Sequence, residues 1–273
     1  MKISSLSRIY VDRKLSKDIL LNLEDVHYHY LKTVLRLKVN DKVRIFNGSD
    51  GEFIGKITDI TRNNISVLLM DLFRTIAKEP NLTLALAVIK NDKMLDAISM
   101  AVQLGVTVIA PLNTERSQFH KINTDKIKRC IIEFTEQSER LVPPTLLPLS
   151  LLNNFLEQTS HNFILYANEN EDPNKTLLTV YSNVLENWNV NREVSERSVV
   201  TICEHANPHM FCETNLEEQK SITVIIGPEG GFSENELNMF AQQSNCYSFS
   251  LGPNVLRTET AVAASLAQAA LLR

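Results

Sequence analysis

Two segments near the C-terminus each lead from an apolar run, through a loop of glycine and proline, into a pattern typical of a helix start. The first segment is ITVIIGPEGGFSENEL at residues 222–237, and the second is FSLGPNVLRTETAV at residues 249–262. Strands that run into such loops and then into helices are typical of α/β folds, where parallel strands end at one edge of a sheet. The two segments therefore predict a parallel sheet with a ligand site at the carboxyl ends of its strands.

The same alternation of strands and helices runs through the chain from Asn81 onward. Strands are expected at residues 82–89, 106–110, 162–166 and 221–226, and helices at residues 92–104, 124–139 and 149–156. A polar stretch with an acidic excess looks inserted at about residues 170–220, and within it residues 177–188 are expected to be helical. The sequence therefore predicts an α/β domain over residues 80–273 that carries an acidic insertion.

A separate module rich in β-strands is expected before this domain. Its strands are expected at residues 8–11, 42–46, 52–60 and 65–70, and a helix at residues 25–36. The sequence NGSDG at residues 47–51 is a strong hairpin signal between the second and third of these strands. The polar segment at residues 74–80 is typical of a domain boundary. We therefore expect a small β barrel over residues 1–74.

The two predicted domains differ in charge. The whole chain has a net charge of −4, but residues 1–78 hold 14 basic and 9 acidic residues, a net charge of +5. Residues 79–273 hold 14 basic and 23 acidic residues, a net charge of −9. Because a phosphate backbone is attracted by local rather than total charge, a basic module on an acidic domain is compatible with RNA or DNA binding. The alternative is a surface gradient without function.

Length and composition favour a cytoplasmic protein with a full hydrophobic core. The chain has 273 residues, of which 44% are hydrophobic, and no run approaches the roughly 18 apolar residues that a membrane span requires. The first ten residues, MKISSLSRIY, lack the apolar run of a signal peptide. Because the four cysteines are scattered, we expect reduced thiols rather than a disulfide framework.

Four potential zinc ligands lie within the acidic insertion. They are Cys203, His205, His209 and Cys212. Structural zinc sites usually hold paired ligands on two separate elements, whereas these side chains form a single run that Pro208 interrupts. We therefore expect no metal there, and a metal-dependent regulator is the least favoured function.

The first glycine loop has the form of a ligand-binding turn. Gly230 and Gly231 permit backbone angles and a close ligand approach that other residues exclude, and Ser233 with Glu236 matches the capping box of a helix start. The loop resembles a phosphate cradle, but Glu229 would repel phosphate, and neither a following Lys-Ser or Lys-Thr pair nor a G-x-G-x-x-G motif is present. We expect a ligand with few phosphates, unless the loop is only a tight turn.

The second loop ends in a dense polar cluster, Arg257-Thr258-Glu259-Thr260, before a helix rich in Ala and Leu. Such groups are costly to bury without partners, so the cluster indicates recognition or catalysis. In the alternative interpretation, one of the threonines caps the helix, and Arg257 and Glu259 form a surface pair.

At these residues and at four further motifs the chain resembles a known family. Besides IIGPEGGFSENEL and SLGPNVLRTETAVAASLAQAALL, the motifs are RIYV at residues 8–11, HYLKTVLRLKVNDKVRIFNG at 29–48, LGVTVIAPLNTERS at 104–117 and EQSERLVPP at 136–144. Together they are similar to the RsmE family of SPOUT methyltransferases, and they extend over most of the chain. Enzymes of that family use S-adenosylmethionine to methylate N3 of a uridine, U1498, in 16S ribosomal RNA.

This resemblance implies a fold, a cofactor and partners. The fold is an N-terminal PUA-like β barrel for RNA and a C-terminal SPOUT α/β domain threaded as a trefoil knot. The partners are a second copy of the chain, as a homodimer, and the small ribosomal subunit. S-adenosylmethionine would lie among loops at residues 165–169, 227–231 and 251–260. The residues expected to bind it are Leu165, Asn168, Glu169, Ile226, Gly227, Pro228, Glu229, Gly230, Gly231, Leu251, Gly252, Leu256, Thr258 and Thr260.

Three residues depart from the family pattern. Asn254 stands where the family often has an arginine, which removes a cation beside the cofactor loop. Met100 and Gln103 replace a lysine and a glutamate that are common in the helix before LGV.

A methyl group on a sulfonium is already activated, so the enzyme mainly has to orient the acceptor and exclude water. We expect Arg257 to stabilise negative charge that develops on the uracil carbonyl groups, with Glu259 orienting Arg257. The residues expected to bind RNA are Arg8, Lys32, Arg36 and Arg116. Two alternatives remain open, namely a knotted methyltransferase that modifies another RNA position and a noncatalytic RNA-binding protein.

Overall fold

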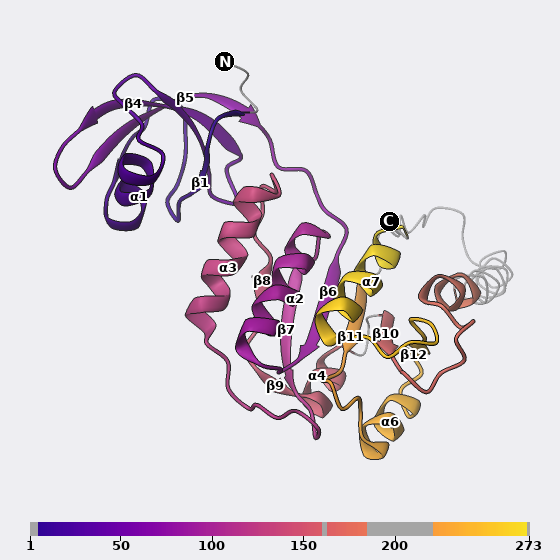
Figure 1. Cartoon of the computed structure of the whole chain (residues 1–273). Coiled ribbons are helices and arrows are strands. Elements are labelled where there is room, and N and C mark those ends of the chain that lie inside the picture. Colours follow the sequence, from indigo (N-terminus) through magenta and orange to yellow (C-terminus); the bar gives the residue numbers. More distant parts are fainter. Residues whose placement is uncertain (1–4, 160–162, 185–220, 272–273) are drawn as a thin grey trace, which may run out of the picture. The chain divides into compact units, whose positions relative to one another are not determined.

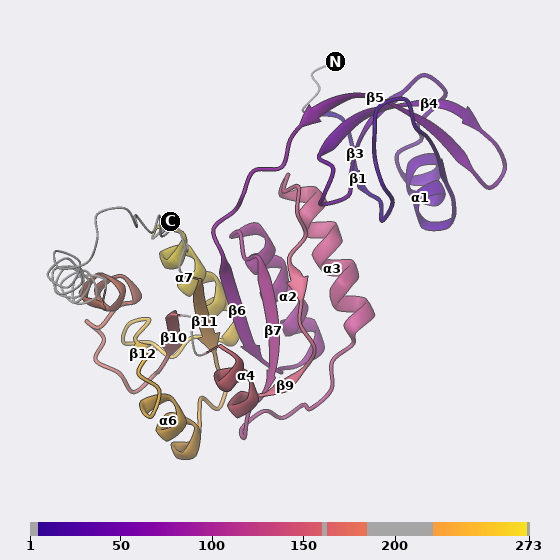
Figure 2. The ribbon, with the colours of Figure 1, turned by 180° about the vertical axis from the view of Figure 1, so that it is seen from behind.

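The computed structural model describes residues 5–159, 163–184 and 221–271, and its internal contacts divide the chain into two units (Figures 1 and 2). The first unit comprises Met1–Glu79 and Thr124–Pro144, and the second comprises Pro80–Asn123 and Thr145–Arg273. Helix α3 (Thr124–Gln137) therefore belongs by its contacts to the first unit, although chain order alone assigns it to the C-terminal domain.

A five-stranded sheet forms the centre of the first unit. In spatial order its strands are β1 (Arg8–Tyr10), β3 (Lys42–Phe46), β4 (Glu52–Ile60), β5 (Ile65–Arg74) and β2 (Leu20–Leu23). β1 runs parallel to β3, and the other neighbours are antiparallel. Side chains such as Ile45, Ile57 and Val67 are fully buried in one core. The β-rich N-terminal module is thus confirmed, and β2 is a strand that the sequence did not predict.

The turn between β3 and β4 is the hairpin that NGSDG predicts. Asn47 Oδ1 accepts hydrogen bonds from the backbone N–H groups of Ser49 at 3.0 Å and Asp50 at 2.8 Å, so this side chain closes the turn. The backbone N–H of Leu15 donates to Asp50 Oδ2 at 2.8 Å and, as the main cause, lowers the pKa of Asp50. The hairpin is therefore tied to the segment that precedes β2.

The helix expected at residues 25–36 changes type along its length. α1 spans Asp25–His29 and continues as a π-helical turn, η2, over Tyr30–Val34. In this turn the N–H of Leu35 donates to the carbonyl of Tyr30, five residues earlier, at 2.9 Å. Arg36 then adopts a left-handed φ of 55°, which ends the helical segment. Apolar periodicity alone does not distinguish an α-helical turn from a π-helical one.

The second unit is built on a parallel sheet. In spatial order its strands are β12 (Cys246–Phe249), β10 (Phe163–Ala167), β11 (Ile222–Ile226), β6 (Leu82–Ala87), β7 (Val108–Asn113) and β8 (Thr145–Leu146), and β9 (Ser150–Leu151) also pairs with β7. All of these pairings are parallel. The α/β fold class is confirmed.

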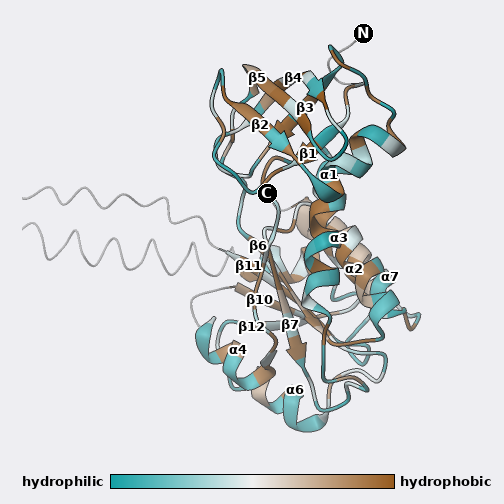
Figure 3. Cartoon of the chain, turned by 90° about the vertical axis from the view of Figure 1, so that its left-hand side faces the viewer, coloured by the Kyte–Doolittle hydropathy of each residue, from teal (hydrophilic) through white to brown (hydrophobic). Residues whose placement is uncertain are grey.

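Helices cover both faces of this sheet (Figure 3). α4 (Leu152–Gln158) and α6 (Glu234–Ala241) pack on one face, where Phe155 and Phe240 join a core with strand residues such as Ile225. α2 (Asn91–Gln103) and α7 (Thr258–Ala270) pack together on the other face. A central strand such as β6 is consequently buried along its whole length, as expected for a strand covered on both sides.

Two expected elements differ from the prediction or are described only in part. The helix expected at residues 149–156 begins only at Leu152, because Ser150 and Leu151 pair with β7. Residues 177–184 are helical, while the rest of the helix expected at 177–188 lies outside the described residues, as do the four potential zinc ligands at residues 203–212. Of the helices that the structure describes, none combines the length and apolar character that crossing a membrane requires.

Candidate active site

Three loops at the carboxyl ends of neighbouring strands form a pocket in the second unit. The loops follow β10, β11 and β12, which are adjacent in the sheet. Because parallel strands end at one edge, loops that are distant in the chain meet there. The pocket is lined by most of the residues that the sequence predicts for the cofactor, namely Asn168, Glu169, Ile226, Gly227, Pro228, Glu229, Gly231, Leu251, Gly252, Leu256 and Thr258.

Three residues of the predicted set are placed elsewhere. Leu165 is fully buried inside β10, and Thr260 is exposed on the first turn of α7. The carbonyl oxygen of Gly230 accepts a hydrogen bond from Arg116 Nη1 at 2.8 Å beside the pocket. Nearness in the chain to a lining residue does not fix where a residue's atoms point, so these three residues do not line the pocket.

The sequence did not single out several further lining residues, namely Ala167, Asn170, Phe232, Leu237, Asn254, Val255 and Ala261. Phe232 packs under the glycine loop, since a Cβ added at Gly227 would lie 3.2 Å from its ring. The same ring packs edge to face against Phe240, with centroids 5.0 Å apart. An aromatic residue directly after a glycine pair is a signal that could have identified Phe232.

Gly231 is the position in this loop where the backbone requires glycine. Its φ is +65°, in the left-handed region, and an added Cβ would lie 3.0 Å from Oε1 of Glu169. The loops after β10 and β11 therefore touch at this point. At Gly230 an added Cβ would meet Arg116 at 3.6 Å, an ordinary contact distance.

A buried carboxylate joins the glycine loop to the loop that follows β7. Ser233 Oγ accepts from the N–H of Glu236 at 3.1 Å, and the N–H of Ser233 donates to Glu236 Oε2 at 2.9 Å, so the predicted capping box is confirmed. Glu236 Oε1 accepts a further hydrogen bond from the N–H of Glu115 at 2.8 Å. Since Glu236 is only 2% exposed, its two oxygens hold two loops together away from solvent.

Arg116 lies on the loop after β7 and is exposed to solvent. Its hydrogen bond to the carbonyl of Gly230 adds a second link between that loop and the glycine loop. The RNA-binding role that the sequence predicts for Arg116 stays a prediction, and the structure adds a role in holding the glycine loop.

The loop after β10 is tied to β12 by a polar cluster. Ser248 Oγ donates to Glu171 Oε2, and Lys175 Nζ donates to the same carboxylate oxygen at 2.9 Å. Lys175 Nζ also lies 2.9 Å from Ser248 Oγ. The hydrogen bonds from Ser248 and Lys175 lower the pKa of Glu171. The cluster therefore anchors the segment that leads from the pocket into the acidic insertion.

The start of α7 carries the polar cluster that is expected to act in catalysis. Arg257 is the N-cap residue, and its exposed side chain forms no hydrogen bond or ion pair with another residue in the described ranges. Thr258 Oγ1 donates to the carbonyl of Gly227 at 3.4 Å. Glu259 is 9% exposed, and its Oε1 lies 3.2 Å from Nζ of Lys93 in α2. The ion pair of Glu259 is thus with Lys93, a residue that the sequence did not single out.

Both members of this pair are held in their charged forms. Burial raises the pKa of Glu259, but its own backbone N–H and the Lys93 ammonium outweigh burial, so the net pKa is lowered. Hydrogen bonds to Glu259 and then to Asp96 raise the pKa of Lys93. At neutral pH the contact is therefore between a carboxylate and an ammonium.

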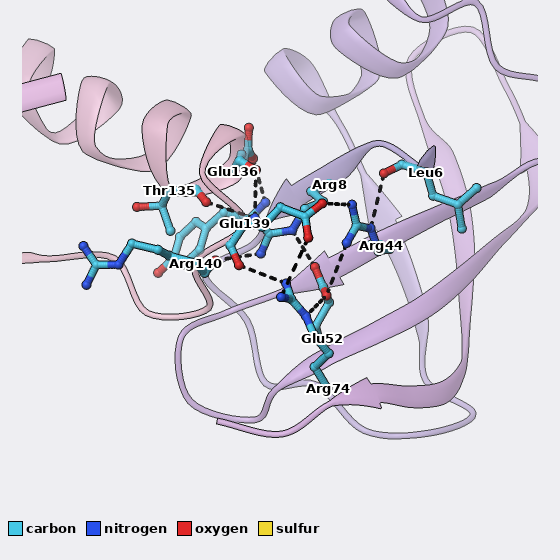
Figure 4. A network of polar contacts seen from close by, with 10 residues as sticks. Leu6, Arg8, Arg44, Glu52, Arg74, Thr135, Glu136, Glu139 and Arg140 are labelled. Carbon is cyan, nitrogen blue, oxygen red and sulfur yellow. Dashed lines mark hydrogen bonds and ion pairs between the residues drawn. The ribbon is translucent and has the colours of Figure 1, made fainter. Parts of the chain in front are cut away.

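Arg8 is enclosed by a polar network in the first unit (Figure 4). Its Nε lies 2.6 Å from Glu52 Oε1. Its Nη atoms donate to three backbone carbonyls at the end of α3 and just beyond, those of Thr135, Glu136 and Arg140, at 2.9, 2.7 and 2.6 Å. Because Arg8 is only 6% exposed, the prediction that it binds RNA phosphates is wrong. The sequence shows that Arg8 is charged, but it does not show the carboxylate and the carbonyl groups that surround it in the fold.

Further arginines complete this network around Glu52, which is fully buried. Arg74 Nε lies 2.7 Å from Glu52 Oε2, and Arg44 Nη1 lies 3.8 Å from the same oxygen. Arg44 also pairs with Glu139 at 2.8 Å and is the main cause that lowers the pKa of Glu139. The network attaches the end of α3 to strands β1, β3, β4 and β5.

The other two basic residues predicted in the first unit have different surroundings. Lys32 on η2 and Arg36 just after it are both exposed. Their side chains therefore remain accessible for the predicted contacts with phosphate.

The lining of the pocket restricts the class of ligand. Glu169 and Glu229 contribute carboxylates, while none of the lining residues in the described chain is a lysine or arginine. Ile226, Leu237 and Leu256 add apolar surface. Highly phosphorylated anions would be repelled, whereas a ligand with positive charge and apolar parts fits. Within the described ranges, no group of three or more metal-binding side chains is present.

Comparisons with known proteins agree with this organisation. Residues 77–190 and 178–270 match the model of an RNA methyltransferase domain, and residues 24–70 match that of an RNA methyltransferase PUA domain. The ribosomal RNA small subunit methyltransferase E of Rickettsia conorii is 40% identical over 97% of this chain and 96% of its own.

Two solved structures share the fold. One is from Legionella pneumophila and is described as a methyltransferase in complex with the cofactor SAM; it has 26% identity and a TM-score of 0.74 over 96% of each chain. The other is a ribosomal RNA small subunit methyltransferase E from Neisseria gonorrhoeae bound to S-adenosyl methionine, with 23% identity and a TM-score of 0.74 over 98% of each chain.

Proposed function

The chain belongs to the RsmE family of ribosomal RNA small subunit methyltransferases, and on this basis we propose that it methylates N3 of a uridine, U1498, in 16S ribosomal RNA. It is an S-adenosylmethionine-dependent ribosomal RNA methyltransferase. The observation that carries the proposal is the pocket itself, in which two family motifs, IIGPEGGFSENEL and SLGPNVLRTETAV, meet the loop after β10 at the ends of three adjacent strands. The choice of U1498 and its N3 rests on the family resemblance.

The residues of the pocket fit S-adenosylmethionine. When bound, this group supplies a methyl group on a positively charged sulfonium. The carboxylates of Glu169 and Glu229 complement positive charge, and Ile226 and Leu256 offer contacts for apolar parts of a ligand. The left-handed backbone at Gly231 exposes the glycine loop to close approach without a side chain.

Arg257 is proposed to act on the acceptor base. Uridine N3 carries a proton and lies on the Watson–Crick edge, so the base has to be unpaired or turned out before it can react. Negative charge develops on the uracil carbonyl groups as the proton leaves. Arg257 is exposed and stands in the chain between Leu256 and Thr258, which both line the pocket, and its guanidinium would stabilise that charge.

The remaining parts of the proposal concern RNA binding and assembly. Residues 1–74 would act as the PUA-like RNA-binding domain, with Lys32 and Arg36 in contact with phosphates. Residues 80–273 would act as the SPOUT domain, with its C-terminal part threaded as a trefoil knot. The protein would work in the cytoplasm as a homodimer on the assembled small subunit.

Methyl transfer from labelled S-adenosylmethionine to 30S particles, compared with naked 16S RNA, tests this function. We expect label in 3-methyluridine after digestion to nucleosides, and faster transfer to 30S particles. Label in a different nucleoside would indicate a knotted methyltransferase with another target. RNA binding without any calorimetric signal for S-adenosylmethionine would indicate a noncatalytic RNA-binding protein.

A further inference from the structure

Lys93 occupies an electrostatically unfavourable position in α2. It lies in the first turn of this helix, where the helix dipole disfavours positive charge. Its Nζ lies 3.2 Å from Oε1 of Glu259 and 3.3 Å from Oδ2 of Asp96. Glu259, in the first turn of α7, stands where the dipole favours negative charge. The contact with Glu259 gives a physical reason for a lysine at this position.

The ion pair of Lys93 and Glu259 is more buried than that of Lys90, the N-cap residue of α2, with Asp92. The side chains of Lys90 and Asp92 are 67% and 60% exposed, which is the geometry of a surface pair with little effect on stability. In the pair of Lys93 and Glu259 the side chains are 36% and 12% exposed. Loss of Lys93 would leave the Glu259 carboxylate without its ion-pair partner, and we expect this to cost more than loss of the Lys90–Asp92 surface pair.

The first turn of α7 is held by side-chain contacts of the residues that follow Arg257. No side chain caps the helix at Arg257. The turn is instead held at the next two residues, by the contact of Thr258 with the carbonyl of Gly227 and by that of Glu259 with Lys93. The direction in which Arg257 leaves the helix start is therefore set by its neighbours rather than by a contact of its own.

We propose that Lys93 is a positioning residue for methyl transfer, which acts through Glu259 to fix the first turn of α7 and thereby Arg257 and Thr258 beside the pocket. The inference rests on the proposed function, because Arg257 is assigned there to the acceptor base. Lys93 is not among the residues that line the pocket, so its effect passes through the helix start.

The test compares Lys93→Met, Lys93→Arg, Glu259→Gln and the double variant Lys93→Met/Glu259→Gln. Lys90→Met is the matched control, since it removes a lysine from the start of the same helix without a contact to α7. For each variant, methyl transfer to 30S particles gives kcat and KM for RNA, calorimetry gives the Kd of S-adenosylmethionine, and thermal unfolding gives Tm.

We expect Lys93→Met to lower kcat about tenfold, the scale of coupling between residues in direct contact, and to weaken S-adenosylmethionine binding several-fold through Thr258. KM for RNA should stay unchanged, because Lys93 lies outside the predicted RNA-binding residues. Lys93→Arg should retain most of the activity. The double variant should be no worse than the poorer single variant, and Lys90→Met should match the wild type.

Losses that multiply in the double variant would show that Lys93 acts independently of Glu259 and would overturn the inference, as would an unchanged kcat and Kd in Lys93→Met. An equal loss in Lys90→Met would also overturn it. If the wild type binds S-adenosylmethionine but methylates no ribosomal RNA, the proposed function fails, whereas the calorimetric comparison still tests whether Lys93 holds Thr258 beside the pocket.

Discussion

Gly230 and Gly231 are neighbours in the glycine loop, but only Gly230 has the backbone angles and the space for an alanine side chain. We expect Gly231→Ala to weaken S-adenosylmethionine binding about tenfold or more, because a non-glycine residue in the left-handed region costs about 1–2 kcal/mol and the new Cβ would lie 3.0 Å from Glu169. Gly230→Ala adds only an ordinary contact and should bind almost as the wild type does. Calorimetry on both variants checks this, and equal affinities would contradict it.

The acid stability of the first unit is expected to depend on Glu139. Its pKa is lowered in the folded state, mainly by Arg44, from a usual value of about 4.5. A lowered pKa stabilises the fold above the unfolded pKa, and this contribution is lost as the pH falls through the folded pKa. Glu139→Gln should therefore lower Tm at pH 7, and the difference from the wild type should shrink as the pH falls below the usual value of about 4.5.

Glu133→Gln is the matched control for this measurement. Glu133 lies on α3, shortly before Glu139 in the chain, and is exposed, but it forms no ion pair within the described residues. Thermal unfolding of the three proteins from acidic to neutral pH should show a pH-dependent difference for Glu139→Gln alone. A difference that stays constant over this range would refute the role of Glu139.

Single residues show how far the sequence could predict the site. The motifs identified most of the pocket lining, because loops after parallel strands share one edge of the sheet. Arg8 and Lys32 were both predicted to bind RNA because both are basic. In the structure Arg8 is buried against carbonyl groups at the end of α3, whereas Lys32 is exposed. Lys93 escaped prediction because its partner Glu259 is distant in the chain and no local pattern connects them.

At the start of α6, substitutions of the two residues of the capping box are expected to differ in their effect on S-adenosylmethionine binding. Ser233→Ala removes one cap hydrogen bond, which is worth about 1 kcal/mol, and leaves the contact between Glu236 and Glu115 in place. Glu236→Gln turns an NH₂ donor toward one of two backbone N–H donors and so disturbs both loops. We expect Glu236→Gln to weaken S-adenosylmethionine binding more than Ser233→Ala, as measured by calorimetry. The reverse order would refute this.

The network around Glu52 is expected to dominate the stability of the first unit. Glu52→Gln leaves the buried guanidinium of Arg8 without its carboxylate partner, and breaking a buried pair in this way costs about 3 kcal/mol. Asp71→Asn removes the ion pair between Lys17 and Asp71, whose side chains are 63% and 70% exposed, and should change the stability far less. Urea unfolding of both variants measures the difference, and equal costs would rule out a special role for the network.

The elements themselves could be predicted where periodicity or turn chemistry is strong. Strands β3 and β4 have the expected bounds, since NGSDG marks the turn between them, and Ser233 caps α6 as the capping box predicts. β2 was missed because four residues are too few for a clear alternation. The π-helical turn η2 was missed because it has only 5 residues, too few for its different period to show in the apolar positions.

For the whole molecule, the division of charge predicts how RNA binding responds to salt. The double variant Lys32→Ala/Arg36→Ala should bind RNA more weakly than the wild type, and the loss of affinity should not depend on the RNA sequence. It should also reduce the slope of log K against log salt by about 1.5, since each phosphate contact contributes about 0.7 to 0.9. Fluorescence anisotropy between about 50 and 200 mM salt measures this slope. Lys17→Ala, which removes a lysine already paired with Asp71, is the control and should change it less.

The parallel sheet also has a consequence for the order in which the chain becomes functional. β11 pairs with β6 through Ile222 and Leu82, which are far apart in the chain, so this pairing has to close a long loop. The strands of the β3–β4 hairpin in the first unit are joined by a short turn. Pairings of such long range form slowly. The pocket needs the ends of three such strands, so the capacity to bind S-adenosylmethionine arises last during refolding. A molecule that has completed only its basic first unit could reach RNA but could not yet modify it.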